Sequence, residues 1–292
     1  MNNFKKYAVP KELRIVYCAL CIGGSMRLDQ TLVYRGLLPS RERAKAAILA
    51  GEVTVNGTEE RKPSREIREA DTLALRETHS YVGRGYLKLR KALEAFSLDV
   101  AGKICMDIGA STGGFNQLLL ERGAAKVYAI DVGTGQLAAS LRTNPRVVSL
   151  EKTDFRAVTA QQVGRPEFAC ADVSFISLKL LLPNLYALLS ANGEAVCLLK
   201  PQFETGKPVK HGVVKDPKEH IRVIAEVIRA AEQAGFACRN LGYSPVMGGN
   251  GNIEFLLHLS INDNNTDSVI SINDNYLSIN DIVNQAWEDL KA

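Results

Sequence analysis

The chain has 292 residues, enough for one large domain or for a medium-sized domain with a small one. Hydrophobic residues make up 46% of the sequence and charged residues 23%, values typical of a soluble globular protein with a sizeable core. No stretch reaches the length of a transmembrane helix, and no clean signal-peptide cleavage site is visible, which argues against a membrane-spanning or secreted protein. We therefore expect a cytoplasmic protein that does not act on a membrane.

Charge is distributed unevenly along the chain. Residues 1–91 carry 18 Lys or Arg and 10 Asp or Glu, a net charge of +8. Residues 260–292 carry one Lys and six Asp or Glu, a net charge of −5. A basic front end is typical of a domain that binds a polyanion such as RNA, although a solvated basic surface has the same composition.

Residues 1–25 show no clear periodicity, and we expect them to form an extension in front of the folded domains. They contain Cys18 and Cys21 as a C-x-x-C pair, which lacks the second pair of a zinc site. Three other cysteines lie within apolar, strand-like runs and are predicted to be core residues: Cys105, Cys170 and Cys197.

Residues 26–76 have the pattern of a small α+β unit. Leu28, Leu32 and Val33 share one face of a predicted first helix. A second helix is predicted over residues 41–50, with Ser40 as its N-cap and Gly51 at its end. Val53 and Val55 then alternate as a strand before the turn formed by Asn56 and Gly57.

After a polar joint and a basic helix over residues 77–91, strands and helices alternate through residues 92–259. This alternation predicts an α/β fold, a Rossmann-like and mainly parallel sheet with helices on both faces. The last two strands are separated only by a loop, so the final strand is predicted to be antiparallel. The predicted strands are 103–109, 126–131, 147–150, 168–173, 194–200, 237–243 and 253–259; the predicted helices are 113–122, 135–141, 178–189 and 217–234.

Residues 260–292 differ in character from the preceding domain. The tetrapeptide Ser-Ile-Asn-Asp occurs three times, and the segment is rich in Asn, Asp and Ser. This composition predicts a flexible acidic tail that catalysis does not need, with at most a short helix over residues 279–290.

A glycine-containing segment, Asp-Ile-Gly-Ala-Ser-Thr-Gly-Gly-Phe, joins a predicted strand to a predicted helix. Glycines let the backbone approach a ligand closely, and a helix N-terminus favours a carboxylate. The next strand ends in an acidic residue that can bind both hydroxyls of an adenosine ribose. We predict a cofactor site made by Asp107, Gly109, Ser111, Thr112, Gly113, Gly114, Phe115, Asp131 and Asp154, with Asp154 beside the adenine.

The spacing in this segment favours S-adenosylmethionine over a dinucleotide. A dinucleotide fingerprint has Gly at three positions, and the second of them is Ser111 here. In the S-adenosylmethionine interpretation, Asp107 lies near the ammonium group of the methionine and the amides around Gly113 lie near its carboxylate. A tight strand-to-helix turn without a ligand is the remaining alternative.

Four ionisable residues are predicted to share one edge of the sheet: Lys88, Asp172, Lys200 and Glu254. Ligands of open α/β sheets bind at the carboxyl ends of the parallel strands, where Asp172 and Lys200 lie. Glu254 reaches the same edge because its strand runs in the opposite direction. Each residue alone could be a surface charge or a salt-bridge partner, but their common placement predicts a catalytic site.

These four residues match the Lys-Asp-Lys-Glu tetrad of ribose 2′-O-methyltransferases, and the sequence resembles the FtsJ-like superfamily. Residues 26–75 resemble the small RNA-binding domain of ribosomal protein S4, for example in Arg27-Leu28-Asp29 and Val55-Asn56-Gly57. Together with Asp172-Val173-Ser174-Phe175-Ile176-Ser177 and Lys200-Pro201-Gln202-Phe203-Glu204, the chain resembles the TlyA family of rRNA cytidine-2′-O-methyltransferases, also called hemolysin A.

The resemblance implies an S-adenosylmethionine-dependent enzyme that methylates the ribose 2′-hydroxyl of cytidine in 16S or 23S rRNA without a metal ion. Lys200 would activate the hydroxyl, Asp172 would position that lysine, and Lys88 and Glu254 would hold the hydroxyl and the lysine network. Contacts to rRNA are expected from Arg27, Arg41, Arg43, Lys45 and Arg84. A base methyltransferase, and a membrane-active or RNA-binding protein without catalysis, are the open alternatives.

Overall fold

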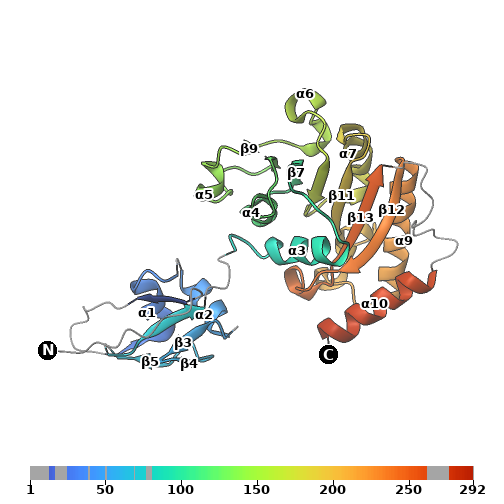
Figure 1. The fold of residues 1–292 in the computed structure, drawn as a ribbon. Helices are drawn as coiled ribbons and strands as arrows, with labels where there is room; N and C mark the ends of the chain where they lie inside the picture. Colours follow the sequence, from blue (N-terminus) through green and yellow to red (C-terminus); the bar gives the residue numbers. More distant parts are fainter. Residues whose placement is uncertain are drawn as a thin grey trace. The chain divides into compact units, whose positions relative to one another are not determined.

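The computed structural model describes residues 13–16, 25–38, 40–49, 51–68, 70–76, 81–261 and 276–291. The chain divides into two compact units, Met1–Ser80 and Tyr81–Ala292, and each is described by itself (Figure 1). The C-x-x-C pair and residues 262–275 of the predicted tail lie outside the described residues. Within the described ranges, no helix is long and apolar enough to cross a membrane.

The small unit contains a four-stranded antiparallel sheet, in the order β1-β6-β3-β4, a two-stranded sheet and two helices. Its core consists of apolar side chains from the helices and strands, among them Leu28, Ile48 and Val53, all fully buried. The elements are β1 (Leu13–Val16), β2 (Met26–Arg27), α1 (Leu28–Tyr34), α2 (Arg41–Leu49), β3 (Val53–Val55), β4 (Thr58–Glu59), β5 (Glu66–Ile67) and β6 (Leu73–Arg76).

Local signals in the small unit act as predicted, but its sheet also includes residues from the predicted extension. The turn between β3 and β4 has positive φ angles at both Asn56 and Gly57, as a two-residue hairpin of this kind requires. However, Leu13–Val16 of the predicted extension forms β1, which pairs with β6. A short strand can be recruited in this way because the other edge of β6 would otherwise present unpaired backbone groups.

The larger unit is built on a seven-stranded sheet in the order β12-β13-β11-β10-β7-β8-β9. The pairs from β11 to β9 are parallel, and β13 is antiparallel to both of its neighbours, which confirms the predicted fold class and the direction of the last strand. The strands are β7 (Ile104–Ile108), β8 (Lys126–Ile130), β9 (Val147–Leu150), β10 (Phe168–Ala171), β11 (Glu194–Leu199), β12 (Phe236–Tyr243) and β13 (Phe255–Ile261).

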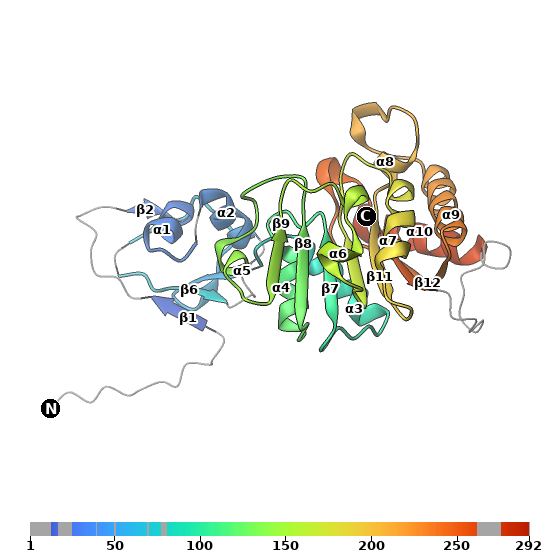
Figure 2. The same cartoon turned by 90° about the horizontal axis from the view of Figure 1, so that it is seen from above.

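Helices cover both faces of this sheet (Figures 1 and 2). Side chains alternate along β7: Cys105 packs in the cluster with α3 and α4, whereas Met106 and Ile108 pack in the cluster with α7, α9 and α10. The helices are α3 (Gly85–Ala95), α4 (Gly114–Glu121), α5 (Ala139–Arg142), α6 (Ala160–Val163), α7 (Leu182–Leu188), α8 (Pro201–Glu204), α9 (Pro217–Gln233) and α10 (Tyr276–Lys291), with short 3-10 turns η1 (Phe155–Ala157), η2 (Leu178–Leu180), η3 (Lys210–Gly212) and η4 (Gly249–Gly251).

The short helix expected over residues 279–290 is present as α10, but it is packed into the core and is not part of a flexible tail. Helix α10 packs against α9 and β12, and Ile279, Val283 and Ala286 are fully buried in the same core as those elements. The indole N–H of Trp287 donates a hydrogen bond of 3.1 Å to Nδ1 of His220 in α9. The three buried residues are spaced by four and three positions, so the polar composition conceals an amphipathic helix.

The helix predicted over residues 135–141 is also too long. Only Ala139–Arg142 is helical, because Gly135 has a φ of 65°, in the left-handed region that ends regular helix.

Candidate active site

The candidate site lies where the parallel strands end. Strands β7, β8, β10 and β11 end at Ile108, Ile130, Ala171 and Leu199, and β13 begins one residue after Glu254. The loops that follow these ends are therefore brought to one edge of the sheet, where open α/β sheets bind ligands. Of the cavities that open there, two share the lining residues Gly109, Ser111, Asp172 and Ser174.

The glycine-containing loop after β7 is shaped by close backbone contacts. Gly109 has a φ of 81°, and a Cβ atom there would lie 2.5 Å from the carbonyl oxygen of Asp172. Gly113 has a φ of 96°, and a Cβ atom there would lie 2.3 Å from Leu141. Only glycine fits these two positions, and α4 begins immediately afterwards without a side-chain cap at Gly113.

Asp107, at the end of β7, is fully buried. Its Oδ2 accepts hydrogen bonds from the backbone N–H of Asn116 at 3.2 Å and from the side-chain amide of Asn116 at 2.5 Å. Its Oδ1 is buried without a hydrogen-bond partner among the described residues. Burial, and next the nearby charge of Asp172, raises the pKa of Asp107 to about 8, so a cationic ligand group would satisfy this carboxyl.

Asp131 and Asp154 line the larger cavity, of about 450 Å³, as predicted. Asp131 accepts the backbone N–H of Ser111 through Oδ2 and that of Gly133 through Oδ1, each at 2.7 Å. Each carboxylate oxygen keeps a second lone pair for a ligand hydroxyl. Asp154 pairs with Arg156, and apolar side chains such as Phe155 and Ile176 provide surfaces that suit an aromatic ring.

The smaller cavity, of about 310 Å³, brings together all four predicted catalytic residues. Nζ of Lys88 lies 2.7 Å from Oε2 of Glu254 and 3.2 Å from Oδ2 of Asp172. Nζ of Lys200 lies 2.7 Å from Oδ1 of Asp172. Asp172 thus bridges the two lysines, and the set has no net charge when all four residues are ionised.

These charges are shielded from solvent, since Lys88, Lys200 and Glu254 are at most 8% exposed. Removing ionised groups from water is costly, so burial of three of them beside the half-buried Asp172 requires compensation by mutual contacts. The cluster also touches the cavity, where a polar substrate group can enter. The arrangement can therefore orient a hydroxyl group and stabilise negative charge that develops on it.

The structure adds two residues that the sequence patterns did not single out. The Ser174 hydroxyl accepts a hydrogen bond of 2.8 Å from Nζ of Lys200, and Asn116 holds Asp107. The sequence signal that could have identified Ser174 is its position two residues after Asp172, in the loop that follows β10. Thr112, Gly114, Phe115 and Arg84 line the smaller cavity as well, and Arg84 is exposed at the start of α3.

In the small unit, the predicted RNA-binding residues lie on or beside α1 and α2. Arg27 and Arg41 pair with the buried carboxylate of Asp29 at 3.0 and 3.1 Å, so part of their charge is used within the unit. Lys45 is exposed on α2. Arg43 lies in the same helix, and its side chain is outside the described atoms.

Comparison with known families agrees with this geometry. A model of the FtsJ-like methyltransferase family matches residues 81–261, and an S4 domain model matches residues 26–73. The chain belongs to the FtsJ-like methyltransferase family. The S4 domain coincides with the small unit, and the FtsJ-like domain contains the sheet, both cavities and the four clustered residues.

Several relatives of this FtsJ-like methyltransferase match most of the chain. The chain is 45% identical to the 16S/23S rRNA (cytidine-2′-O)-methyltransferase TlyA of Mycobacterium tuberculosis, over 80% of this chain and 89% of that one. It is 39% identical to hemolysin A of Brachyspira hyodysenteriae, over 81% of this chain and 100% of that one. A solved structure of a protein described as a hemolysin, from Streptococcus thermophilus, has 43% identity and a TM-score of 0.70, and the match covers 91% of this chain and 97% of that one.

Proposed function

We propose that this protein transfers a methyl group from S-adenosylmethionine to the ribose 2′-hydroxyl of a cytidine in 16S or 23S rRNA. The observation that carries the proposal is the contact of Lys200 with Asp172 and Ser174, at the residues shared by the two cavities. One cavity suits the cofactor, and the other holds the charged cluster. The curated relative from M. tuberculosis has this activity by name.

The residues around the larger cavity fit S-adenosylmethionine. The unpartnered Oδ1 of Asp107 fits an ammonium group, and the amides at the start of α4 fit a carboxylate. Asp131 fits the ribose hydroxyls, and the apolar wall near Phe155 fits the adenine, with Asp154 beside it. When bound, S-adenosylmethionine supplies a methyl group that a sulfonium has already activated, so the chemistry does not need a metal ion.

The protein's own contribution is to prepare the hydroxyl. A lysine ammonium has three N–H donors. Lys200 donates one of them to Ser174 and forms an ion pair with Asp172, and a further donor is available to the incoming hydroxyl. In this role Lys200 stabilises the charge that develops on the oxygen as the hydroxyl proton passes to solvent.

Lys88 and Glu254 support this arrangement from the other side. Lys88 holds the second oxygen of Asp172, and Glu254 balances the charge of Lys88. Asp172 therefore lies between two cations, one on each carboxylate oxygen. The S4 domain, with Arg27, Arg41, Arg43 and Lys45, and Arg84 of the catalytic unit would bind the rRNA backbone.

The test is to locate the transferred methyl group. Purified protein is incubated with methyl-labelled S-adenosylmethionine and with ribosomal subunits that lack the modification, and the rRNA is digested to nucleosides. We expect the label in 2′-O-methylcytidine. A label on the base would instead identify a base methyltransferase, and absence of transfer together with absence of S-adenosylmethionine binding would identify a protein without catalysis.

A further inference from the structure

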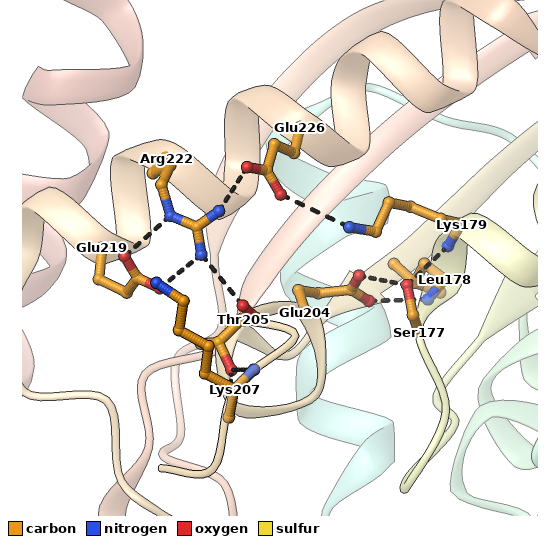
Figure 3. Close-up of polar contacts among 9 residues, drawn as sticks. All are labelled: Ser177, Leu178, Lys179, Glu204, Thr205, Lys207, Glu219, Arg222 and Glu226. Atoms are coloured by element: carbon orange, nitrogen blue, oxygen red, sulfur yellow. Dashed lines mark hydrogen bonds and ion pairs between the residues drawn. The ribbon is translucent and has the colours of Figure 1, made fainter.

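Glu204 is a buried carboxylate that the proposed chemistry does not use. It ends α8, four residues after Lys200, and is 3% exposed. Its Oε1 accepts the backbone N–H of Leu178 at 2.7 Å, and its Oε2 accepts the hydroxyl of Ser177 at 2.5 Å (Figure 3). Burial raises the pKa of this carboxyl, so a charged group at this position is costly and needs these two partners.

Both partners of Glu204 belong to the loop that forms the active site. Residues 172–178 follow β10 and carry Asp172 and Ser174, the two residues that contact Lys200 at 2.7 and 2.8 Å. Segments 172–178 and 200–204 are therefore joined at two places, once through Lys200 and once through Glu204.

Between these two joints, the loop has an unfavourable conformation. Phe175 has a φ of 65°, in the left-handed region that bulky side chains rarely adopt. Its ring is 91% exposed and lies with its centroid 5.2 Å from that of Phe203. A strained residue of this kind persists only where its surroundings fix it. The contacts of Lys200 before Phe175 and of Glu204 after it provide this restraint.

Neighbouring ion pairs connect the same segments to α9, but through exposed side chains. Arg222 donates to the carbonyl oxygen of Thr205 at 3.3 Å and pairs with Glu219 and Glu226, and Glu226 lies 3.5 Å from Nζ of Lys179 (Figure 3). Between 31% and 40% of each charged side chain is exposed. Ion pairs at this exposure contribute little, so Glu204 is the strong connection between the segments.

We propose that Glu204 is a positioning residue, which holds the loop 172–178 in the conformation that keeps Asp172 and Ser174 on Lys200. This proposal depends on the proposed function in one respect, which is that the methyl group is transferred to a ribose hydroxyl. Without the carboxylate, the loop relaxes around Phe175, and Asp172 leaves Lys200 for much of the time. The glycine loop after β7 and Asp131 belong to other segments and keep their places.

The test compares full-length variants Glu204→Ala and Glu204→Gln with the control Glu226→Ala, which changes an adjacent carboxylate that does not contact the loop backbone. We expect Glu204→Ala to lower single-turnover methyl transfer at saturating substrates by about 10- to 100-fold, the effect of a small misplacement of reacting groups. Affinity for S-adenosylmethionine, measured by calorimetry, should fall by at most about tenfold, because the loop supplies only one wall of the larger cavity, whereas Asp107 and Asp131 belong to other segments.

Glu204→Gln should restore most of the lost rate. Its amide oxygen can accept the N–H of Leu178, and its amide N–H can donate to the Ser177 hydroxyl. Glu226→Ala should transfer methyl groups like the wild type. A wild-type rate in Glu204→Ala, or an equal loss of rate in Glu204→Ala and Glu204→Gln, would overturn the proposal.

Amide hydrogen exchange measures the stability of the loop 172–178 and needs no substrate. Peptides covering residues 172–178 should exchange faster in Glu204→Ala but not in Glu204→Gln or Glu226→Ala. If the wild type transfers no methyl group to ribose, the proposed function fails, while exchange still decides the role of Glu204. If Glu204→Ala does not fold, Ser177→Ala removes one of the two hydrogen bonds; an unchanged transfer rate and unchanged exchange in that variant would overturn the proposal.

Discussion

The two units place their charged residues in different environments. In the S4 domain, Arg27 and Arg41 pair with Asp29 and keep 44% and 48% of their side-chain surface exposed. In the catalytic unit, Lys88 and Lys200 keep 9% and 10%. Exposed cations attract a polyanion over a distance and are screened by salt, whereas buried cations act on one atom at short range.

The carboxylates show the same contrast. Burial opposes the charged form of Asp29, but hydrogen bonds from Arg27 and Arg41 more than offset this effect, so the pKa of Asp29 is lowered. Asp107 lies deeper in its domain, faces the charge of Asp172 and receives only amide hydrogen bonds, and its pKa is raised. Asp29 is thus paired with two arginines of its own unit, whereas Asp107 has no ion-pair partner among the described residues.

The largest effect is expected from Lys200→Ala. The rate of single-turnover methyl transfer should fall by roughly 10²–10⁴, the usual range for a positioned acid–base or charge-stabilising group. Affinities for S-adenosylmethionine and rRNA should change little, because Lys200 acts mainly as the transition state forms. Lys126→Ala, at the opposite end of β8, is the matched control. A near wild-type transfer rate in folded Lys200→Ala protein would show that the buried lysine does not act on the reacting hydroxyl.

A smaller effect is expected when residues 1–80 are removed. The slope of log affinity for rRNA against log salt concentration should become less negative by about 3–4, because four candidate phosphate contacts each release counterions. Filter binding over a salt series measures this slope, and binding of S-adenosylmethionine serves as the control for folding. An unchanged slope would mean that the exposed arginines of the S4 domain do not contact rRNA.

The smallest effect concerns Asp107 and pH. A folded-state pKa of about 8, raised from 3.8 by burial and by Asp172, means that the folded protein holds this proton more tightly than the unfolded chain does. The resulting stability is complete below pH 4 and is lost as pH rises through 8. Between pH 5 and 7, the free energy of unfolding of the wild type should fall, relative to Asp107→Asn, by about 1 kcal/mol per pH unit. Urea unfolding of both proteins without ligand measures this difference. If their free energies of unfolding change with pH in parallel, the pKa of Asp107 is not raised in the folded protein.

Much of the catalytic unit could be predicted from its sequence. Apolar runs indicated the central strands β7, β10 and β11 because these are buried on both faces, and Cys105, Cys170 and Cys197 are core residues as predicted. The glycines after β7 and the polar residues at strand ends led to the cavities because parallel strands end at one edge of the sheet.

Other features depended on tertiary contacts that no local pattern contains. Strand β1 forms because β6 offers it a free edge, and α10 forms because α9 and β12 cover Ile279, Val283 and Ala286. The role of Ser174 depends on the distance between two loops, which sequence spacing does not encode. The insertion of β13 between β11 and β12 was not predicted either, although its direction was.

That insertion has a consequence for the time at which the enzyme becomes active. The chain leaves the ribosome from its N-terminus, so the S4 domain, Lys88, Asp172 and Lys200 emerge before Glu254 and β13. Until then β11 and β12 have no strand between them, and Lys88 lacks its second carboxylate. The proposed RNA contacts of the S4 domain are therefore available during synthesis before the catalytic cluster is complete, so that a growing chain can hold the RNA-rich particle that makes it without yet modifying it.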